Sequence, residues 1–124
     1  MRGAGVALAV LLAAAPPAAA DERARGEALF EACRSCHSLD PAEAGIPGPS
    51  LARLNGRPVG GAEGFDYSPA LAAARQQGLT WDAGRLVAFL ADPEAMFPGT
   101  WMSPPGRLSE AERKALADYL LQGD

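Results

Sequence analysis

The sequence predicts an all-α fold, because several segments carry helical periodicity or helix-boundary signals and the stretches between them are rich in proline and glycine. The chain has 124 residues, of which 48% are hydrophobic, and this size and composition suit one domain rather than two. The sequence contains no internal repeat. We therefore expect a single helical domain.

The first two predicted helices are defined by their ends. Residues 22–33 are expected to form a helix that leads directly into a pair of cysteines. Ser68-Pro69 is a strong helix start, because serine caps the first turn and proline suits the first helical position. Gly78 marks the end of this second helix.

Two further helices follow in the last third of the chain. Residues 82–91 carry apolar side chains spaced i, i+3, i+4, and Asp92-Pro93 ends this segment. The apolar face consists of Leu86, Phe89 and Leu90. Residues 109–112 (Ser-Glu-Ala-Glu) form a capping box that opens a final helix. The apolar face of that helix consists of Leu116, Tyr119 and Leu120.

Two stretches are predicted to be irregular. Proline or glycine recurs every few residues between His37 and Phe65, and a loop of this length is unusual in a compact domain unless it has a ligand to wrap. Prolines at 93, 98, 104 and 105 predict that the stretch around them is neither helix nor central strand.

Charge and reactive side chains exclude several function classes. The formal net charge is −4, and the ten arginines and one lysine (Lys114) are spread along the chain, which argues against a general nucleic-acid binder. Two cysteines and one histidine do not supply the four ligands of a Cys₂His₂ or Cys₄ zinc site. Any chemistry is therefore expected at one place.

Residues 1–20 are predicted to be a signal peptide, and residues 21–124 the functional domain. Arg2 precedes an apolar stretch from Ala4 to Ala15, and Ala18–Ala20 offers a small-residue cleavage site before Asp21. The apolar stretch is shorter than the roughly 20 residues that a membrane span needs. The alternative to a cleaved signal peptide is an uncleaved N-terminal anchor. Cleavage after Ala20 predicts a periplasmic protein without a membrane span, with ten basic and fifteen acidic residues, a net −5.

The pentapeptide Cys33-Arg34-Ser35-Cys36-His37 matches the signature for covalent attachment of c-type haem. On a helix the two cysteines lie on one face, so each thiol can add to a haem vinyl group while His37 directs its imidazole to the iron. The alternatives are a disulfide, or a thiol–disulfide exchange motif. An exchange motif follows a strand in a thioredoxin-like unit, whereas helix is predicted here. Haem attachment is the favoured interpretation.

A haem iron that moves electrons usually has a second axial ligand, and no second histidine exists. After signal cleavage the remaining methionines are Met96 and Met102, which lie in one proline-rich stretch. Methionine is more often a core filler than a ligand. Sequence chemistry alone does not choose between the two.

From Gly26 to Leu120 the chain resembles the class I cytochromes c, small proteins with one His/Met-ligated haem. The matching motifs, in order, are Gly26-x-x-x-Phe30, Cys33-x-x-Cys36-His37, Gly48-Pro49-x-Leu51, Gly56-Arg57, Gly64-Phe65-x-Tyr67-Ser68, Trp81, Pro98-Gly99-Thr100-x-Met102 and Leu116-x-x-Tyr119-Leu120. The resemblance implies a class I cytochrome c fold, in which helices and loops wrap one covalently bound haem c.

The resemblance also implies roles for individual residues. Met102 becomes the sixth ligand, and Met96 a packing residue. The carbonyl of Pro49 would accept a hydrogen bond from His37 and fix its ring. Three side chains are implied near the haem propionates: Arg57, Tyr67 and Trp81. Two departures from the family are Leu71, where relatives often have a polar residue, and Trp101, which replaces a common lysine.

The implied function is single-electron transfer by a soluble carrier whose haem cycles between Fe(III) and Fe(II), and not enzymatic catalysis. The alternatives are a haem-based ligand sensor, a peroxidase-like protein with a displaceable Met102, or a subunit permanently docked to a dehydrogenase. Redox protein partners are implied: a donor such as a dehydrogenase or quinol-oxidising complex, and an acceptor such as a terminal oxidase or reductase. A monomer is expected. Trp101 is either an exposed docking residue or packed under its own loop.

Overall fold

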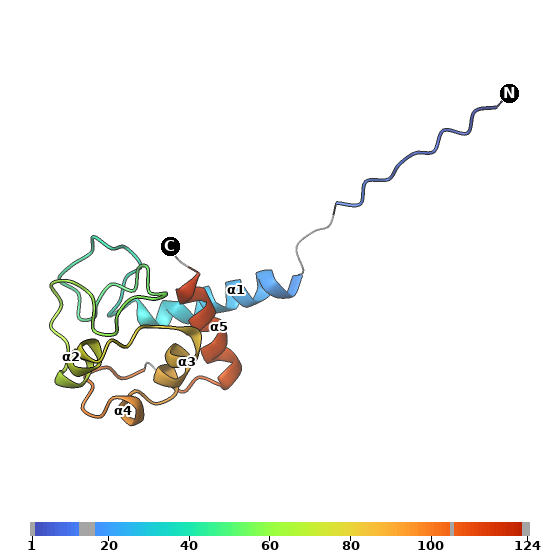
Figure 1. Ribbon diagram of the computed structural model, residues 1–124. Helices are drawn as coiled ribbons and strands as arrows, with labels where there is room; N and C mark the ends of the chain where they lie inside the picture. Colours follow the sequence, from blue (N-terminus) through green and yellow to red (C-terminus); the bar gives the residue numbers. More distant parts are fainter. Residues whose placement is uncertain (1, 13–16, 105, 123–124) are drawn as a thin grey trace.

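The computed structural model describes residues 2–12, 17–104 and 106–122 (Figure 1). Its helices, in chain order, are α1 (Pro17–Phe30), the 3₁₀ turn η1 (Glu31–Cys33), α2 (Pro69–Gln76), α3 (Ala83–Ala91), α4 (Pro93–Met96) and α5 (Glu110–Leu121). Across these residues no strand forms, and one isolated antiparallel bridge joins Pro58 to Thr80. The predicted all-α class is confirmed.

Helices α1 and α5 cross at very close range. A Cβ atom added at Gly26 would lie 2.5 Å from the carbonyl oxygen of Ala115 and 2.6 Å from the Cβ of Tyr119. Only glycine therefore lets the two backbones approach so closely. Beyond this crossing, the rings of Phe30 and Tyr119 lie 6.0 Å apart, and α3 packs against another part of α5. Figure 1 shows α1, α3 and α5 gathered on one side of the long loop.

The core lies between these helices and the segments before α2 and α3. Its largest fully buried apolar side chains are Phe30, Leu54, Val59 and Leu116. Phe89 links two parts of this core, because its ring lies 5.2 Å from that of Trp81 and 6.0 Å from that of Phe97.

The predicted helix starts are confirmed by their capping contacts. The Ser68 hydroxyl accepts from the amide of Leu71 at the start of α2, and the Asp82 carboxylate accepts from the amide of Arg85 at the start of α3. At α5 the reciprocal capping box between Ser109 and Glu112 is complete. Local signals of this kind need no tertiary partner, since donor and acceptor lie three residues apart.

Two predictions about helix boundaries were wrong. The first helix begins at Pro17 rather than at residue 22, since proline at a first helical position loses no hydrogen bond and alanines continue the helix. Its last turn is the 3₁₀ turn η1. The stretch after Asp92 does contain a helical turn, α4, because Pro93 occupies its first position and the Asp92 carboxylate caps it through the amide of Ala95.

The long irregular stretch before α2 is confirmed, and backbone hydrogen bonds fold it onto its neighbours. The amide of Leu51 donates to the carbonyl of Ser38 at 2.8 Å. Further along, the amide of Gly56 donates to the carbonyl of Trp81 at 2.9 Å, and that of Val59 to the carbonyl of Leu79 at 2.8 Å. Because the amide of Gly48 also donates to the carbonyl of Cys36, the loop is tied at one end to the cysteine pair and at the other to the segment before α3.

Residues 2–12 are exposed and have no helix or strand. Within the described ranges, no helix combines the length and apolar character needed to cross a membrane. Part of the predicted signal sequence, residues 1 and 13–16, lies outside the described residues. The expected cleavage after Ala20 stays a prediction, and that position falls inside α1.

Candidate haem-binding site

A cavity of about 460 Å³ opens between the long loop, η1, α3, α5 and the segment that follows α4. This volume is typical of pockets that hold small molecules. All eight residues predicted at a cofactor site line it: Cys33, Cys36, His37, Pro49, Arg57, Tyr67, Trp81 and Met102. The fold thus brings together positions that span 70 residues of sequence.

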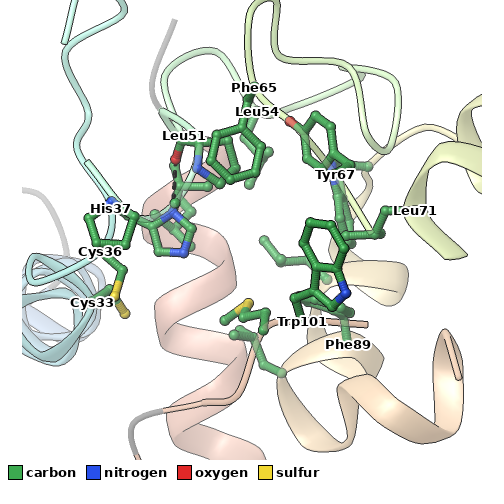
Figure 2. A pocket seen from close by; sticks show the side chains of 18 of the residues that line it. Cys33, Cys36, His37, Leu51, Leu54, Phe65, Tyr67, Leu71, Phe89 and Trp101 are labelled. Carbon is green, nitrogen blue, oxygen red and sulfur yellow. Dashed lines mark hydrogen bonds between the residues drawn. The ribbon is translucent and has the colours of Figure 1, made fainter. Parts of the chain in front are cut away.

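The cysteine pair lies on one wall of the cavity, beside His37 (Figure 2). Cys33 is the last residue of η1, and its carbonyl accepts from the amides of Cys36 at 3.1 Å and His37 at 2.9 Å. These helical contacts carry the turn past the end of η1, so both thiols reach the same cavity. Both cysteines are free thiols, with Cys33 half-buried and Cys36 exposed.

The acidity of Cys33 does not suit thiol–disulfide exchange. Burial, and secondarily the neighbouring Cys36, raises the pKa of the Cys33 thiol. An exchange-active cysteine has the opposite property, a lowered pKa that keeps it as thiolate. The environment of Cys33 therefore argues against the redox-motif alternative.

His37 is held by a hydrogen bond from its ring to the loop. Its Nδ1 atom lies 2.8 Å from the carbonyl oxygen of Pro49, the contact drawn as a dashed line in Figure 2. A carbonyl only accepts, so Nδ1 carries the proton and Nε2 keeps its lone pair. A histidine held in this way presents Nε2 as a metal ligand of defined orientation.

Gly48 is a positioning residue that sequence reasoning missed. Its amide donates to the carbonyl of Cys36 at 2.7 Å. A Cβ atom at this position would lie 2.6 Å from Cε1 and 2.8 Å from Nδ1 of His37. The Gly48-Pro49 motif was visible in the sequence, but the need for glycine appears only when the loop is folded against the imidazole.

A polar region of the cavity is built around Arg57. Its Nη1 atom donates to the carbonyls of Ser50 at 2.8 Å and Ala52 at 3.0 Å, whereas its buried Nε has no partner among the described residues. Burial lowers the pKa of Arg57, although the neighbouring Tyr67 opposes this effect. A buried guanidinium with an unused N–H group favours an anionic partner.

The hydroxyl group of Tyr67 also has an unused hydrogen-bond donor. Its hydroxyl oxygen accepts from the amide of Ala62 at 2.9 Å, so its O–H proton is available to a ligand. Trp81 is buried, and its backbone amide donates to the carbonyl of Arg57 at 2.9 Å. Arg57, Tyr67 and Trp81, the three residues predicted near the haem propionates, thus all line the cavity.

The rest of the lining is mostly apolar and includes residues that the sequence did not assign to the site. These are contributed by the long loop, α2, α3 and α5: Leu51, Leu54, Phe65, Leu71, Leu86, Phe89, Leu90, Leu116 and Leu120. The helical periodicity had identified several of them only as core. Figure 2 shows Leu71 and Tyr67 across the cavity from His37.

The two methionines differ in what they reach. Both pack against the core, but Met102 also lines the cavity, whereas Met96 is not part of its wall. Trp101 lines the cavity as well, and 68% of the residue's surface is exposed. The alternative that Trp101 is packed under its own loop is therefore wrong.

The donor set fits a covalently bound haem. Two thiols and an oriented imidazole occupy one wall, a thioether lies in another part of the lining, and the intervening surface is mostly apolar. The buried Nε of Arg57 has no partner among the described residues, and a carboxylate such as a haem propionate would suit it. Each chemical part of haem c thus has a matching group in this chain.

Comparison with known proteins agrees with this geometry. Residues 23–124 match the family model described as cytochrome c. The chain belongs to the cytochrome c family. It is 39% identical over 115 residues to cytochrome c2 of Blastochloris viridis, covering 93% of this chain and 88% of the relative. Identity to cytochrome c-554 of Methylosinus trichosporium is 36% over 119 residues, covering 96% and 86%.

Solved structures give the same result. Ferricytochrome c2 from Rhodopseudomonas palustris superposes with a TM-score of 0.74 and 33% identity, covering 82% of this chain and 98% of that one. Cytochrome cH from Methylobacterium extorquens gives 0.67 and 37%, covering 79% and 95%. This chain is therefore a class I cytochrome c with one covalently bound haem c, and its function is electron transfer.

Proposed function

We propose that this cytochrome c binds its haem through Cys33 and Cys36 and ligates the iron through His37 and Met102. The observation that carries the proposal is that all four side chains line one cavity. His37 is already oriented by Pro49, and Met102 is the methionine that reaches the cavity. Haem c, when bound, supplies the iron that gains and loses one electron.

Each proposed ligand has a distinct part in this function. The carbonyl of Pro49 holds the Nδ1 proton of His37, which keeps the imidazole in one tautomer and one orientation. The thioether of Met102 favours the reduced iron and so raises the reduction potential relative to a second histidine or water. If His37 and Met102 both ligate the iron, they would keep substrates from it.

Arg57, Tyr67 and Trp81 are proposed to hold the propionate carboxylates. The argument rests on the unpartnered buried Nε of Arg57 and the unused hydroxyl proton of Tyr67. Burying a carboxylate is costly unless it is paired or hydrogen-bonded. Burial lowers the pKa of Arg57. The ordinary pKa of an arginine lies so far above neutrality that the guanidinium keeps its charge.

The family relationship favours an electron carrier over a ligand sensor or peroxidase-like protein. A peroxidase needs a distal acid–base group beside an open iron position, and the single histidine of this chain already has a role as ligand. We propose that the protein is not an enzyme.

We propose that the carrier works in the periplasm after cleavage at Ala20. Support comes from the apolar N-terminal stretch and its small-residue site. Its partners would be redox proteins, a donor such as a dehydrogenase or quinol-oxidising complex and an acceptor such as a terminal oxidase or reductase.

The test is the state of the haem in the purified holoprotein. One haem should stay bound after acid denaturation and solvent extraction, with no free thiol, and the iron should titrate as a one-electron couple. In Cys33→Ala a single thioether remains, so haem content should fall and the pyridine haemochrome band should shift. Freely extractable haem, or a disulfide between Cys33 and Cys36, would overturn the proposal.

A further inference from the structure

Asn55 is the only asparagine of the chain, and a glycine follows it directly. Asparagine is a chemically labile residue, because its side-chain amide can react with the backbone nitrogen of the next residue. Glycine at that next position has no Cβ atom to hinder the approach. Both Asn55 and Gly56 are exposed and lie outside the cavity lining. The pair therefore has the composition and the access to water that a non-enzymatic deamidation needs.

The pair forms the middle of a tight turn whose two ends line the cavity. The amide of Arg57 donates to the carbonyl of Leu54 at 3.1 Å, and Gly56 has a φ of +76°. Positive φ at the third residue of such a turn favours glycine there. Leu54 is 2% exposed and Arg57 is half-buried, and both line the cavity. The ends of the turn are thus anchored, while its middle faces solvent.

The nitrogen that would react is already engaged in a hydrogen bond. The amide of Gly56 donates to the carbonyl of Trp81 at 2.9 Å, and the amide of Trp81 donates to the carbonyl of Arg57 at 2.9 Å. The Gly56 nitrogen has to leave this pairing before it can bond to the Asn55 side chain. Reaction therefore requires the turn to open locally, and the docked turn holds it back.

We propose that Asn55 is a deamidation site gated by the docking of the Leu54–Arg57 turn onto Trp81. The Gly56 nitrogen loses its proton and bonds to Cγ of Asn55, the bond from Cγ to Nδ2 breaks, and ammonia leaves. The product is a five-membered succinimide ring. Water then opens the ring, at Cγ to give aspartate or at the main-chain carbonyl carbon to give isoaspartate. The step needs no oxidant or reductant.

The modification changes both the charge and the backbone of the turn. Each product carries one negative charge more than asparagine, two residues from Arg57. Isoaspartate also adds one carbon atom to the main chain between residues 55 and 56, directly before the contact of Gly56 with Trp81. The turn then docks less well, so the reaction loosens a wall of the cavity.

The test follows the purified holoprotein during incubation in mildly alkaline buffer. Peptide mass spectrometry locates the change at residue 55, and anion exchange separates the product by its added charge. The native holoprotein should react at least about tenfold more slowly than the same protein unfolded in guanidinium, because two backbone hydrogen bonds must open first. Equal rates in the two states would overturn the gate, and no reaction at residue 55 in the unfolded chain would overturn the site.

Two controls establish which group reacts. Asn55→Gln should abolish the reaction, because the longer side chain would have to form a less favourable six-membered ring. The pair Gln77-Gly78 is a control within the same chain, since Gln77 is exposed and Gly78 also has a positive φ, of +77°. Modification at Gln77 as fast as at Asn55 would overturn the assignment to the asparagine side chain.

A pair of conservative variants separates local opening from global unfolding. Leu54→Val shortens the buried anchor of the turn and should speed deamidation of the native holoprotein by about threefold or more. Ala117→Gly also destabilises the fold, but Ala117 is buried in α5 outside the cavity lining, so the rate should stay unchanged. Equal acceleration in the two variants would mean that the reaction passes through global unfolding, and it would overturn the gate.

Discussion

The wall of the cavity that holds His37 is far more tightly constructed than the segment that holds Met102. On the His37 side, three short contacts converge: the amide of His37 donates to Cys33, its ring to Pro49, and the amide of Gly48 to Cys36. On the Met102 side, Thr100 and Gly99 make the last such contacts, at 3.0 Å to Phe97 and 2.9 Å to Glu94. Between 101 and 104, the described chain forms no backbone hydrogen bond.

The difference indicates where the site tolerates change. The His37 wall is formed by neighbouring residues locked to a returning loop, so an added atom there has no room. The segment around Met102 is held by proline stiffness and packing, and it also carries the exposed Trp101. One wall would fix the cofactor, whereas the other offers the proposed ligand Met102 on a less constrained segment. Four substitutions test this comparison.

Gly48→Ala should have the largest effect. The added Cβ would lie 2.6 Å from Cε1 of His37, so either the imidazole or the loop must move. Overpacking of this kind costs about 1–3 kcal/mol of unfolding free energy, and the displaced ring should lower haem loading. Guanidinium unfolding and haem content per chain measure both effects.

Gly84→Ala is the control for Gly48→Ala. Gly84 lies inside α3, where a Cβ atom would meet only an Asp82 carboxylate oxygen at 3.7 Å. Alanine is the better helix former, so the free energy of unfolding should rise by about 0.5–1 kcal/mol with haem content unchanged. Equal haem loading in the two variants would contradict the tight His37 wall.

Met102→Ala should spare haem attachment but change the iron. Two thioethers and His37 remain, so haem content should stay near one per chain. The weak methionine–iron absorption at the near-infrared edge should disappear, the reduction potential should fall, and imidazole should bind the ferric iron. Met96→Ala, whose side chain packs on the core outside the cavity lining, should keep the absorption. The reverse pattern would assign Met96 as the ligand.

Arg57→Gln should have an intermediate effect, because it affects the polar region rather than either ligand. The substitution removes two charged hydrogen bonds, to Ser50 and Ala52, and should cost about 2 kcal/mol of unfolding free energy. Loss of the positive charge should also lower the reduction potential. In Arg85→Gln, which loses one bond to the carbonyl of Thr80 outside the cavity, the potential should not move. Equal potentials in both variants would remove Arg57 from the propionate site.

Glu94→Gln should have the smallest effect. The Glu94 carboxylate accepts from the amide of Gly99 at 2.9 Å, and this exposed contact is one of the few that restrain the turn before Met102. The unfolding free energy should change by about 0.5 kcal/mol or less. Imidazole binding to the ferric protein should strengthen by a few fold, measured by optical titration beside Glu110→Gln as control. No difference between the two would show that packing alone restrains this segment.

The local signals in the sequence determined the helices and the identity of the cofactor. Ser68, Asp82 and Ser109 begin helices because each side chain caps an amide three residues away. Cys33, Cys36 and His37 are adjacent in sequence, so their joint chemistry is readable without a fold. The same local reasoning placed the start of the first helix at residue 22 instead of Pro17, and it missed that Pro93, which ends α3 as predicted, also occupies the first position of the short helix α4.

Contacts between distant segments were decided only by the tertiary structure. The requirement for glycine at 48 arises where a returning loop meets His37, and the distinction between Met96 and Met102 arises from which one faces the cavity. The exposure of Trp101 likewise depends on what packs around it. A sequence records which residues are neighbours along the chain, whereas steric room, burial and the unpartnered Nε of Arg57 depend on atoms that folding brings together from many residues apart.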